Sequence, residues 1–299
     1  MRARALKVAS AASPRLSSLR VRSWHRELRE IVLVLLVTFA YFLTRGVFRG
    51  GDAIAFLHAK QLLAVERALH LSPEAALQRF GLQHPALLEV ANVFYLAGHL
   101  PVLIAVAVWL YWKHRRAYVV IRDAFLISAA IGLSVYVLFP VAPPRYLPGF
   151  VDTLSASGLN LDGSAVGLLY NPYAAMPSLH VGWALLAGIA LVWRARAWWL
   201  RAAGAALPVV MTLVVLVTGN HFLFDVLAGV LVALSALGLS QFLHTSGLRA
   251  RLPWLSFFPV QRASPEAPDA LKPDDDAALV HVAVAAPGTP AASEGAEVI

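Results

Sequence analysis

The sequence predicts an all-α polytopic membrane protein with six transmembrane helices. Three observations predict it: 59% of the 299 residues are hydrophobic, only 14% are charged, and the mean hydropathy is +0.67. Soluble domains are about 45–50% apolar and about 25% charged, so this composition argues against a compact soluble domain and against a disordered chain. The chain has no cysteine, which excludes a disulfide scaffold, thiolate catalysis and Cys-ligated metals.

Six stretches are long and apolar enough, or nearly so, to cross a membrane, for which about 20 residues are needed. They cover residues 30–48, 86–112, 118–140, 177–193, 198–218 and 222–243. Several of them contain Gly, Ala or Ser at close spacing, which is typical of helices that pack against each other.

Residues 50–85, between the first two spans, are too polar to cross a membrane. Within them, residues 52–70 place apolar side chains at helical spacing, which predicts an interfacial or surface helix. The apolar positions are Ile54, Leu57, Leu62, Val65 and Leu69.

The net charge of +8 is an average over two unlike parts of the chain. Residues 263–299 carry seven acids and one base, so they contribute −6 and residues 1–262 contribute +14. This tail is rich in Pro, Ala and Ser and lacks aromatics, which predicts disorder. Residues 1–30 hold eight bases and two acids. A basic arm can bind nucleic acid, but beside a membrane span it is far more often an orienting flank, so we expect no nucleic-acid partner.

The chain is therefore predicted to have five parts. These are a basic, disordered cytosolic arm at 1–30, a first span with an outer interfacial helix at 31–85, a core at 86–243, a basic juxtamembrane segment at 244–262 and an acidic disordered tail at 263–299.

The Lys and Arg residues predict the orientation of the spans. Eighteen of them cluster in residues 1–30, 113–122, 194–201 and 249–262, whereas the alternate loops hold six. Six spans bring all four clusters to one face, which the positive-inside rule makes cytoplasmic. We therefore expect both termini in the cytoplasm and an integral protein of the plasma or cytoplasmic membrane.

Three polar groups then meet at the outer face. They are Arg145 within residues 139–148, Ser178 and His180 within residues 171–180, and Asn220, His221 and Asp225 within residues 218–225. These groups are far apart in sequence, and chance would scatter them over both faces.

The spacing of these residues predicts phosphoryl-transfer chemistry. His221 and Asp225 are i and i+4, so a helix stacks them, and the carboxylate can fix the tautomer and leave the other nitrogen as a base or nucleophile. Pro177 marks a helix start, whose free N–H groups can bind an anion beside Ser178 and His180. Arg145 adds a fixed cation that suits phosphate oxygens.

The hypothesis is that His221 attacks phosphorus and forms a phosphohistidine, while His180 protonates the leaving oxygen and later activates the acceptor. Two other classes stay open. A non-enzymatic transporter or flippase would use His221 and Asp225 as a proton relay. A metal hydrolase would use His180, His221 and Asp225 as a facial triad. Weaker candidates in the second span are Glu89, Asn92 and His99, and Asp152 and Asp162 are expected to be solvated loop residues.

These residues resemble the type 2 phosphatidic acid phosphatase (lipid phosphate phosphatase) superfamily, and most closely its inositolphosphotransferase branch, typified by inositol phosphorylceramide synthase. The second motif of the superfamily has the form P-S-G-H, which residues 177–180 match with Leu179 in place of Gly, as is common in that branch. The third motif ends H-x-x-x-D, matched by His221 and Asp225. The resemblance covers roughly residues 86–243 and implies a six-helix phosphatidic-acid-phosphatase-type fold. It further implies a phosphatase or phosphotransferase core with no metal and no cofactor, in which His221 is the nucleophile, Asp225 its orienting acid and His180 the acid for the leaving group.

The chain departs from the classical motifs at two cations. The first-motif Lys corresponds to Leu138, and the third-motif Ser-Arg pair falls at Val214 and Val215. Asn220, Tyr173 and the backbone at the two helix starts, including that of Leu179, are expected to substitute. Fewer cations hold a phosphate monoester less tightly, which modestly favours a phosphodiester and hence transfer from a phospholipid headgroup. The expected partners are a lipid phosphate or phospholipid and, for transfer, a lipid alcohol acceptor; hydrolysis and transfer stay open, as does the oligomeric state.

Overall fold

The computed structural model describes residues 52–158 and 171–246, together with seven residues between 28 and 39. By its internal contacts the chain divides into two units, Met1–Val260 and Gln261–Ile299. The description below concerns the first unit. Nearly all of the predicted basic arm, most of the first predicted span, most of the juxtamembrane segment, Asp162 and the whole acidic tail lie outside the described residues.

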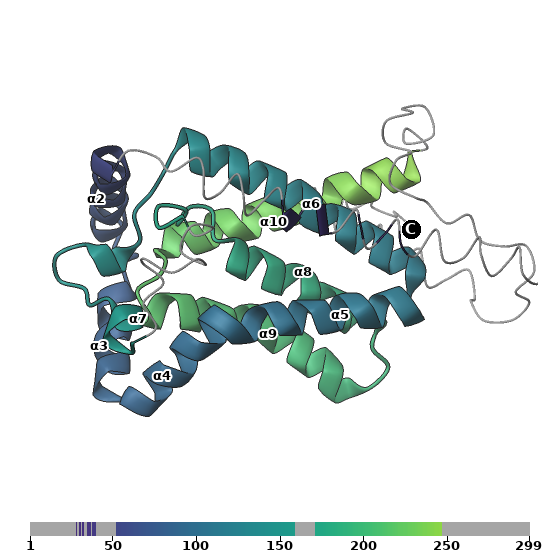
Figure 1. The fold of residues 1–299 in the computed structure, drawn as a ribbon, viewed down its shortest axis with the longest axis horizontal. Coiled ribbons are helices and arrows are strands. Elements are labelled where there is room, and N and C mark those ends of the chain that lie inside the picture. Colours follow the sequence, from purple (N-terminus) through teal and green to yellow (C-terminus); the bar gives the residue numbers. More distant parts are fainter. Residues whose placement is uncertain are drawn as a thin grey trace, which may run out of the picture. The chain divides into compact units, whose positions relative to one another are not determined.

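The described residues form helices and loops without any strand, which confirms the predicted all-α class (Figure 1). In chain order the elements are α2 (Asp52–Ala68), α3 (Glu74–Gln83), α4 (Pro85–Val93), the π-helix η1 (Phe94–Gly98), α5 (His99–Lys113), α6 (Arg115–Leu138), the 3-10 turn η2 (Pro144–Tyr146), α7 (Thr153–Ala156), α8 (Leu179–Arg194), α9 (Trp198–Val217) and α10 (Leu223–Thr245).

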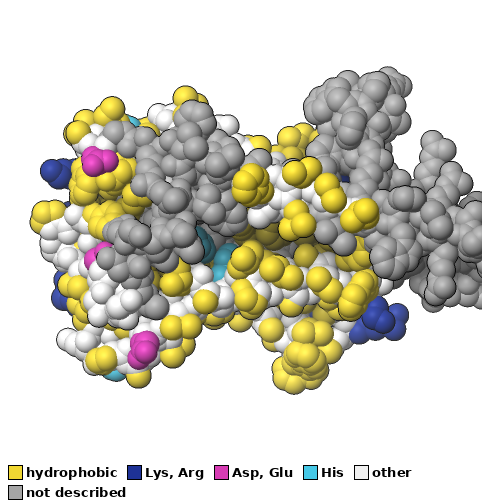
Figure 2. Space-filling model, in the orientation of Figure 1, with side chains coloured by type: hydrophobic (Ala, Val, Ile, Leu, Met, Phe, Trp, Pro, Cys, Tyr) yellow, Lys and Arg dark blue, Asp and Glu magenta, His cyan; other side chains and the backbone are white. Residues whose placement is uncertain are grey.

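Four helical stretches are long and apolar enough to cross a membrane. They are Pro85–Lys113, which joins α4, η1 and α5, and the helices α6, α9 and α10. These correspond to the second, third, fifth and sixth predicted spans. Exposed leucine, valine, isoleucine and tryptophan side chains cover their outer surfaces, as for Leu138, Trp198 and Leu231, which are 81%, 79% and 66% exposed. In Figure 2, apolar side chains are the main coloured type between the two ends of the visible face, and Lys, Arg, Asp and Glu side chains lie toward those ends. The protein is therefore an integral membrane protein.

The fourth predicted span corresponds to α8, which is apolar but only 16 residues long. A helix of that length rises about 24 Å, less than the roughly 30 Å hydrocarbon core. The residues before it, 171–178, form an irregular loop of turns and bends instead of a further helical turn. α8 contacts α5, α6, α9 and α10, so it lies among the other helices.

Small residues let α8 approach its neighbours closely. A Cβ added to Gly182 would lie 2.8 Å from the carbonyl oxygen of Gly229 in α10, and Gly188 and Gly204 make a similarly close pair between α8 and α9. Close backbone approach through small residues is the usual packing mode of membrane helices. The α8–α10 contact is important below because both helices begin at the same cluster of polar residues.

α2 fulfils the prediction of a surface helix, but with a buried face that its apolar pattern does not indicate. The predicted apolar positions are largely exposed, Ile54, Leu57, Val65 and Leu69 by 49–55%. The buried face carries Ala55, Ala59, Leu63 and Glu66. In a soluble protein the apolar face of a surface helix is buried and its polar face is exposed. In α2 the apolar face is exposed, as a membrane interface favours.

α2 and α3 lie across the ends of the long helices, at the end where α10 begins (Figure 1). They also hold the loop that follows α6. The backbone N–H of Ala142 donates to the carbonyl of Ala55 over 3.1 Å, and the Gln78 amide makes two 2.9 Å hydrogen bonds with the backbone of Val151. This segment therefore supports the loop that carries Arg145.

Candidate active site

A tight turn between α9 and α10 presents His221. Gly219 has a φ of +69°, a left-handed conformation that favours glycine, and it lets the chain reverse directly after α9. The N–H groups of Asn220 and His221 both donate to the carbonyl of Val215, over 3.0 and 3.2 Å. The turn is thus closed by backbone hydrogen bonds, and His221 lies two residues before the first residue of α10.

His221 and Asp225 form a buried pair. Their side chains are 4% and 0% exposed, and Nδ1 of His221 lies 3.4 Å from Oδ2 of Asp225. The same Oδ2 accepts a 2.9 Å hydrogen bond from the backbone N–H of Phe222. The other ring nitrogen, Nε2, has no hydrogen-bond partner among the described residues. The arrangement can orient the ring through Nδ1 and leaves Nε2 available to a substrate.

The start of α8 is docked directly on α10. The N–H of Ser178 donates to the carbonyl of Asp225 over 2.8 Å, and Gly229 leaves no room for a Cβ beneath the Ser178 backbone. Ser178 is the N-cap of α8, yet its Oγ is buried and caps no backbone group. Leu179 is 4% exposed and its side chain packs on Gly132 of α6. Leu179 can therefore serve an anion only through its backbone N–H.

His180 lies between His221 and two further rings. Its ring centroid is 6.0 Å from that of His221, 4.5 Å from that of Tyr95 and 5.3 Å from that of His99. The Tyr95 ring is stacked on it with an interplanar angle of 28°. Tyr95 belongs to the π-helix η1, and single π-helical turns are frequent at functional sites. Of the weaker candidates in this span, His99 thus reaches the site.

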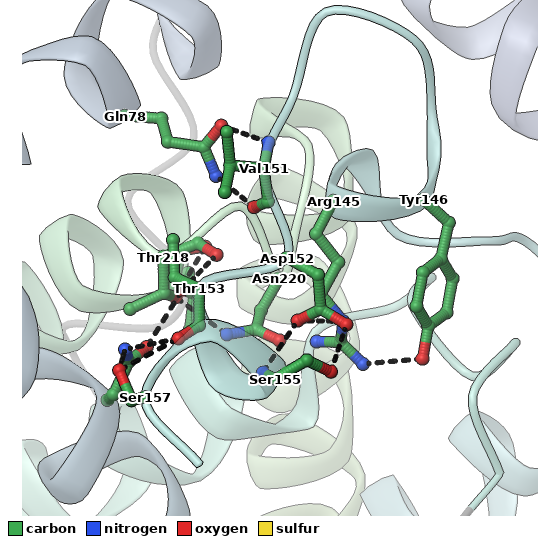
Figure 3. A network of polar contacts seen from close by, with 12 residues as sticks. Gln78, Arg145, Tyr146, Val151, Asp152, Thr153, Ser155, Ser157, Thr218 and Asn220 are labelled. Atoms are coloured by element: carbon green, nitrogen blue, oxygen red, sulfur yellow. Dashed lines mark hydrogen bonds and ion pairs between the residues drawn. The ribbon is translucent and has the colours of Figure 1, made fainter. Parts of the chain in front are cut away.

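Arg145 is joined to the same turn. It is 5% exposed, and its backbone N–H donates to the carbonyl of Gly219 over 2.9 Å. Nε lies 3.6 Å from Oδ1 of Asp152, and Nη2 donates to the hydroxyl of Tyr146 over 3.2 Å (Figure 3). The expectation that Asp152 is a merely solvated loop residue is wrong, because its carboxylate also caps α7 and pairs with the arginine.

Asn220 is oriented by Thr218. The Thr218 hydroxyl donates to the carbonyl of Val214 over 2.7 Å, so it accepts from Nδ2 of Asn220, at 2.6 Å (Figure 3). One N–H of the amide remains for a ligand. The weaker candidate Asn92 exchanges two hydrogen bonds with Thr153, which also donates to the carbonyl of Thr218, so its observed role is to anchor the turn. Glu89, also a weaker candidate, is exposed on α4.

Unpartnered polar atoms concentrate in this cluster. Among the described residues, buried side-chain atoms without a hydrogen-bond partner include Oγ of Ser178, Oδ1 of Asn220, both ring nitrogens of His221 and Oδ1 of Asp225. Buried polar groups are normally paired, so such a concentration indicates groups that await a ligand. Within the described residues, no three His, Asp or Glu side chains converge as a metal site would require.

The positions of the missing classical cations are also explained. Leu138 is 81% exposed at the end of α6, whereas Val214 and Val215 are buried in the hydrophobic core. None of these three side chains has a donor for a phosphate oxygen. Arg145 is consequently the one motif cation that these three groups bring to the turn.

Two acidic residues at this end of the bundle were not predicted. Glu66 of α2 and Glu74 of α3 are completely buried, and each accepts a hydrogen bond from the first turn of α10. Burial raises the pKa of Glu66 to about 8 and also raises the pKa of Glu74. They could have been identified from their position in the sequence. Two acids in an otherwise membrane-facing segment need partners inside the protein.

The chain is similar in sequence to a curated bacterial protein. The chain is 30% identical to phosphoinositol dihydroceramide synthase of Bacteroides thetaiotaomicron over 173 residues. The alignment covers 52% of this chain and 56% of the relative, so the chain spans little more than half the length of that protein. No solved structure matches the chain.

The sequence profile of the PAP2 superfamily matches residues 60–239, which include Arg145, Ser178, His180, His221 and Asp225. Together with the relative above, it confirms the resemblance to the inositol phosphorylceramide synthase-like branch. The profile covers more than half of the sequence, and the chain therefore belongs to the PAP2 superfamily.

Proposed function

We propose that the protein is a lipid phosphotransferase that moves the phosphate-linked headgroup of a phospholipid to a lipid alcohol through a phosphohistidine on His221. The observation that carries the proposal is the arrangement of three side chains. Asp225 lies 3.4 Å behind the His221 ring, and His180 faces that ring at 6.0 Å between centroids. In-line transfer of a phosphoryl group between two oxygens needs a nucleophile, an acid that orients it, and an acid or base on the opposite side.

In the first step Nε2 of His221 attacks phosphorus, and the bond from phosphorus to the diacylglycerol oxygen breaks. His180 gives that oxygen its proton, so diacylglycerol leaves as a neutral alcohol and the headgroup phosphate stays on His221. Asp225 stabilises the positive charge that develops on the His221 ring. Each lost bond is matched by a new one, and the proton passes from His180 to the leaving group.

In the second step the acceptor alcohol gives its proton to His180, and its oxygen attacks phosphorus. The bond from phosphorus to Nε2 breaks, and His221 returns to its starting state. Water in place of the alcohol would give hydrolysis through the same intermediate. The two reactions differ only in what reaches phosphorus from the side of His180.

Arg145, the Ser178 hydroxyl, the backbone N–H of Leu179 and the free N–H of Asn220 are proposed to hold the oxygens on phosphorus. They form a set of donors with a single cation, since Leu138, Val214 and Val215 supply none. A phosphodiester carries one negative charge and a monoester up to two, so this set suits the diester better. The name of the bacterial relative, a phosphoinositol dihydroceramide synthase, favours phosphoinositol as the headgroup and a ceramide-type alcohol as the acceptor.

We further propose that six spans place both termini in the cytoplasm and the His221 cluster at the outer face. The support is the distribution of cations. Lys113, Arg116 and Arg194 lie at the ends of α5, α6 and α8 that are distant in sequence from the polar cluster, and positive residues mark the cytoplasmic side. The substrates would then be drawn from the outer leaflet.

The test is an assay of the purified full-length protein in detergent with three substrates: phosphatidylinositol plus a ceramide, a phosphatidate, and a polyprenyl diphosphate. The proposal predicts inositol phosphorylceramide from the first and little phosphate from the other two. His221→Ala should give no product, whereas His84→Ala, an exposed histidine on the loop before α4, should leave the rate unchanged. Phosphate release from phosphatidate as the main reaction would make the protein a phosphatase. No turnover of any substrate, together with flipping of labelled phospholipid in vesicles, would support the transporter instead.

A further inference from the structure

The start of α10 is held by three carboxyl groups, two of which come from other helices. The first N–H groups of a helix have no partner within it, and an N-cap Ser, Thr, Asp or Asn usually accepts from one of them. Here the N-cap is Phe222, whose side chain has no acceptor. Three consecutive N–H groups instead donate to carboxyl oxygens: Phe222 to Asp225 over 2.9 Å, Leu223 to Glu74 over 2.8 Å, and Phe224 to Glu66 over 2.7 Å.

These contacts fix the backbone next to the proposed nucleophile. His221 immediately precedes Phe222, and Asp225 lies one residue beyond Phe224. Glu66 and Glu74 come from α2 and α3, so they reach this point from outside α8 and α10, the helices that carry His180 and Asp225. Both are 0% exposed and too far along the chain from α10 to be local caps.

We propose that Glu66 and Glu74 are positioning residues of the active site, which hold the first turn of α10 and thereby aim the His221 ring at the reacting phosphorus. This inference rests on the proposed function, since it assigns the pair its role in that reaction. Neither carboxyl group contacts the His221 ring or the reacting atoms.

The remaining oxygens of the pair explain why two acids can lie together. Oε2 of Glu66 and Oε2 of Glu74 are buried and find no donor among the described residues unless one carboxyl group keeps its proton and donates it to the other. The charged groups that face Glu66 are Glu74 from α3 and Asp225 from α10, and the latter is itself paired with His221. No Lys or Arg of the described residues forms an ion pair with either glutamate. Desolvation and these like charges raise the pKa of Glu66 to about 8, so at neutral pH Glu66 keeps a proton that it can donate to Glu74, and the pair carries at most one negative charge.

One negative charge also suits the helix. The N-terminus of α10 carries the positive end of the helix dipole, which a single carboxylate stabilises. Two carboxylates beside Asp225 would bring three negative charges together and push the pair apart. The pair should therefore hold α10 best while it keeps one proton.

The experiment compares alanine at both positions, and glutamine at Glu66, in the purified full-length protein. Glu66→Ala and Glu74→Ala remove the acceptor and should lower kcat per folded molecule by about 10- to 100-fold with KM within about twofold, because the nucleophile is misaimed and the substrate contacts are unchanged. Glu66→Gln keeps a carbonyl oxygen for the Phe224 N–H and should restore kcat to within about threefold of wild type at pH 7. Glu89→Ala and Glu89→Gln, at an exposed acid on α4, are the matched controls and should change nothing.

The pH profile separates positioning from simple capping. Above about pH 8 the wild-type pair loses its shared proton, so kcat should fall with rising pH. Glu66→Gln cannot lose a proton at this position and should lack this part of the alkaline fall, whereas a fall caused by loss of the His180 acid is common to both proteins. Equal alkaline profiles for wild type and Glu66→Gln, or a Glu66→Gln rate as low as that of Glu66→Ala, would overturn the inference. So would alanine variants whose kcat per folded molecule equals that of wild type.

A second readout does not depend on turnover. Diethylpyrocarbonate carbethoxylates accessible imidazoles, and mass spectrometry reports its rate at each histidine. The inference predicts that Glu66→Ala and Glu74→Ala raise the rate at His221 by about fivefold or more, while the rate at the exposed His84 stays constant. An unchanged His221 rate would overturn it. If wild type turns over no phospholipid, the proposed function fails, and the labelling rates still decide whether the pair positions His221.

Discussion

Buried charged and polar groups occur in two regions of the molecule. In one region they are paired with each other, and in the other several of them have no hydrogen-bond partner. Around Arg122 of α6 the charges satisfy one another: Arg122 pairs with Glu30 and with Asp123 (2.8 Å), His244 of α10 contacts Asp123 at 2.9 Å, and the Tyr118 hydroxyl donates to Glu30 over 3.1 Å. Around His221, at the opposite end of α10, buried atoms of Ser178, Asn220 and Asp225 lack partners.

The difference indicates that the region around Arg122 stabilises the fold and that the region around His221 binds a ligand. A buried ion network whose members are all paired needs no ligand, and its removal leaves an uncompensated charge. A cluster of unpartnered polar atoms costs folding free energy and is retained when a ligand satisfies it. The comparison therefore predicts that variants at the Arg122 network change stability without changing the reaction, and that variants at the His221 cluster do the reverse.

The largest expected effect is at His221. His221→Ala should lower kcat by more than about 10³-fold, since a nucleophile has no substitute. Its unfolding temperature in detergent should fall less than that of Arg122→Ala, because the ring makes no hydrogen bond in the described structure and its one polar contact is the 3.4 Å approach to Asp225. His244→Ala is the matched histidine at the other end of α10. It should lower the unfolding temperature and leave kcat per folded molecule as in wild type, and the reverse pattern would refute the comparison.

Arg122→Ala tests the structural region. The substitution leaves Glu30 and Asp123 without their cation, so the free energy of unfolding should fall by about 3–5 kcal/mol. The measurement is chemical unfolding in mixed micelles, with kcat determined on the folded fraction. A kcat reduced more than tenfold in that fraction would show that the network belongs to the reaction.

Arg145→Ala should lower kcat/KM by about 100-fold, because the one cation of the proposed phosphate set is removed. Arg145→Lys should restore only part of this loss, since lysine keeps the charge and loses the fork that donates to two oxygens. Steady-state kinetics with phosphatidylinositol checks both. Equal kinetics for wild type and Arg145→Ala would remove this residue from the site.

Gly229→Ala should disturb the joint between α8 and α10. The added Cβ would meet the Ser178 backbone, and overpacking of this kind costs about 1–3 kcal/mol and displaces the start of α8. Gly238→Ala, in the same helix with open space around it, is the control and should be neutral or slightly stabilising. Circular dichroism melts and kcat are the readouts, and a tolerated Gly229→Ala would contradict the close contact.

The smallest effect concerns stability against pH. The pKa of Glu66 is raised from 4.5 to about 8 in the folded protein, so the unfolded chain releases this proton between those two values while the folded chain keeps it. The carboxyl group therefore costs stability progressively as the pH rises from about 4.5 to 8. Glu66→Gln lacks this cost. The difference between its unfolding temperature and that of wild type should therefore increase in favour of the variant between pH 5 and 8, and should stay constant at higher pH. A constant difference across that range would contradict the raised pKa.

The sequence predicted the long helices well for a simple physical reason. About 20 consecutive apolar residues have few alternatives to a membrane helix, and the ends of α6, α9 and α10 lie within about three residues of the predicted spans. His221 and Asp225 could be paired from their i, i+4 spacing. Ser178 and Arg145 could be brought near them because span topology dictates which ends share a face.

What could not be predicted depends on contacts across the fold. Glu66 and Glu74 were missed because the apolar stripe of α2 was the visible signal, and in this setting that stripe is the exposed face. The partner of Arg145 was missed because Asp152 lies seven residues away in an irregular loop with no periodicity. Tyr95 reaches His180 from a π-helical turn, which shifts the register of the helix. The pattern of apolar residues does not indicate this shift.

The most direct test of the central claim is to trap the intermediate. Wild-type protein mixed with phosphatidylinositol labelled with ³²P and quenched in alkali should carry label that is stable to base and labile to acid, and peptide mapping should place it on His221. Asp225→Asn should accumulate it more slowly, and His84→Ala should be labelled as wild type is. Label on another residue, or turnover without any labelled protein, would contradict a phosphohistidine at His221.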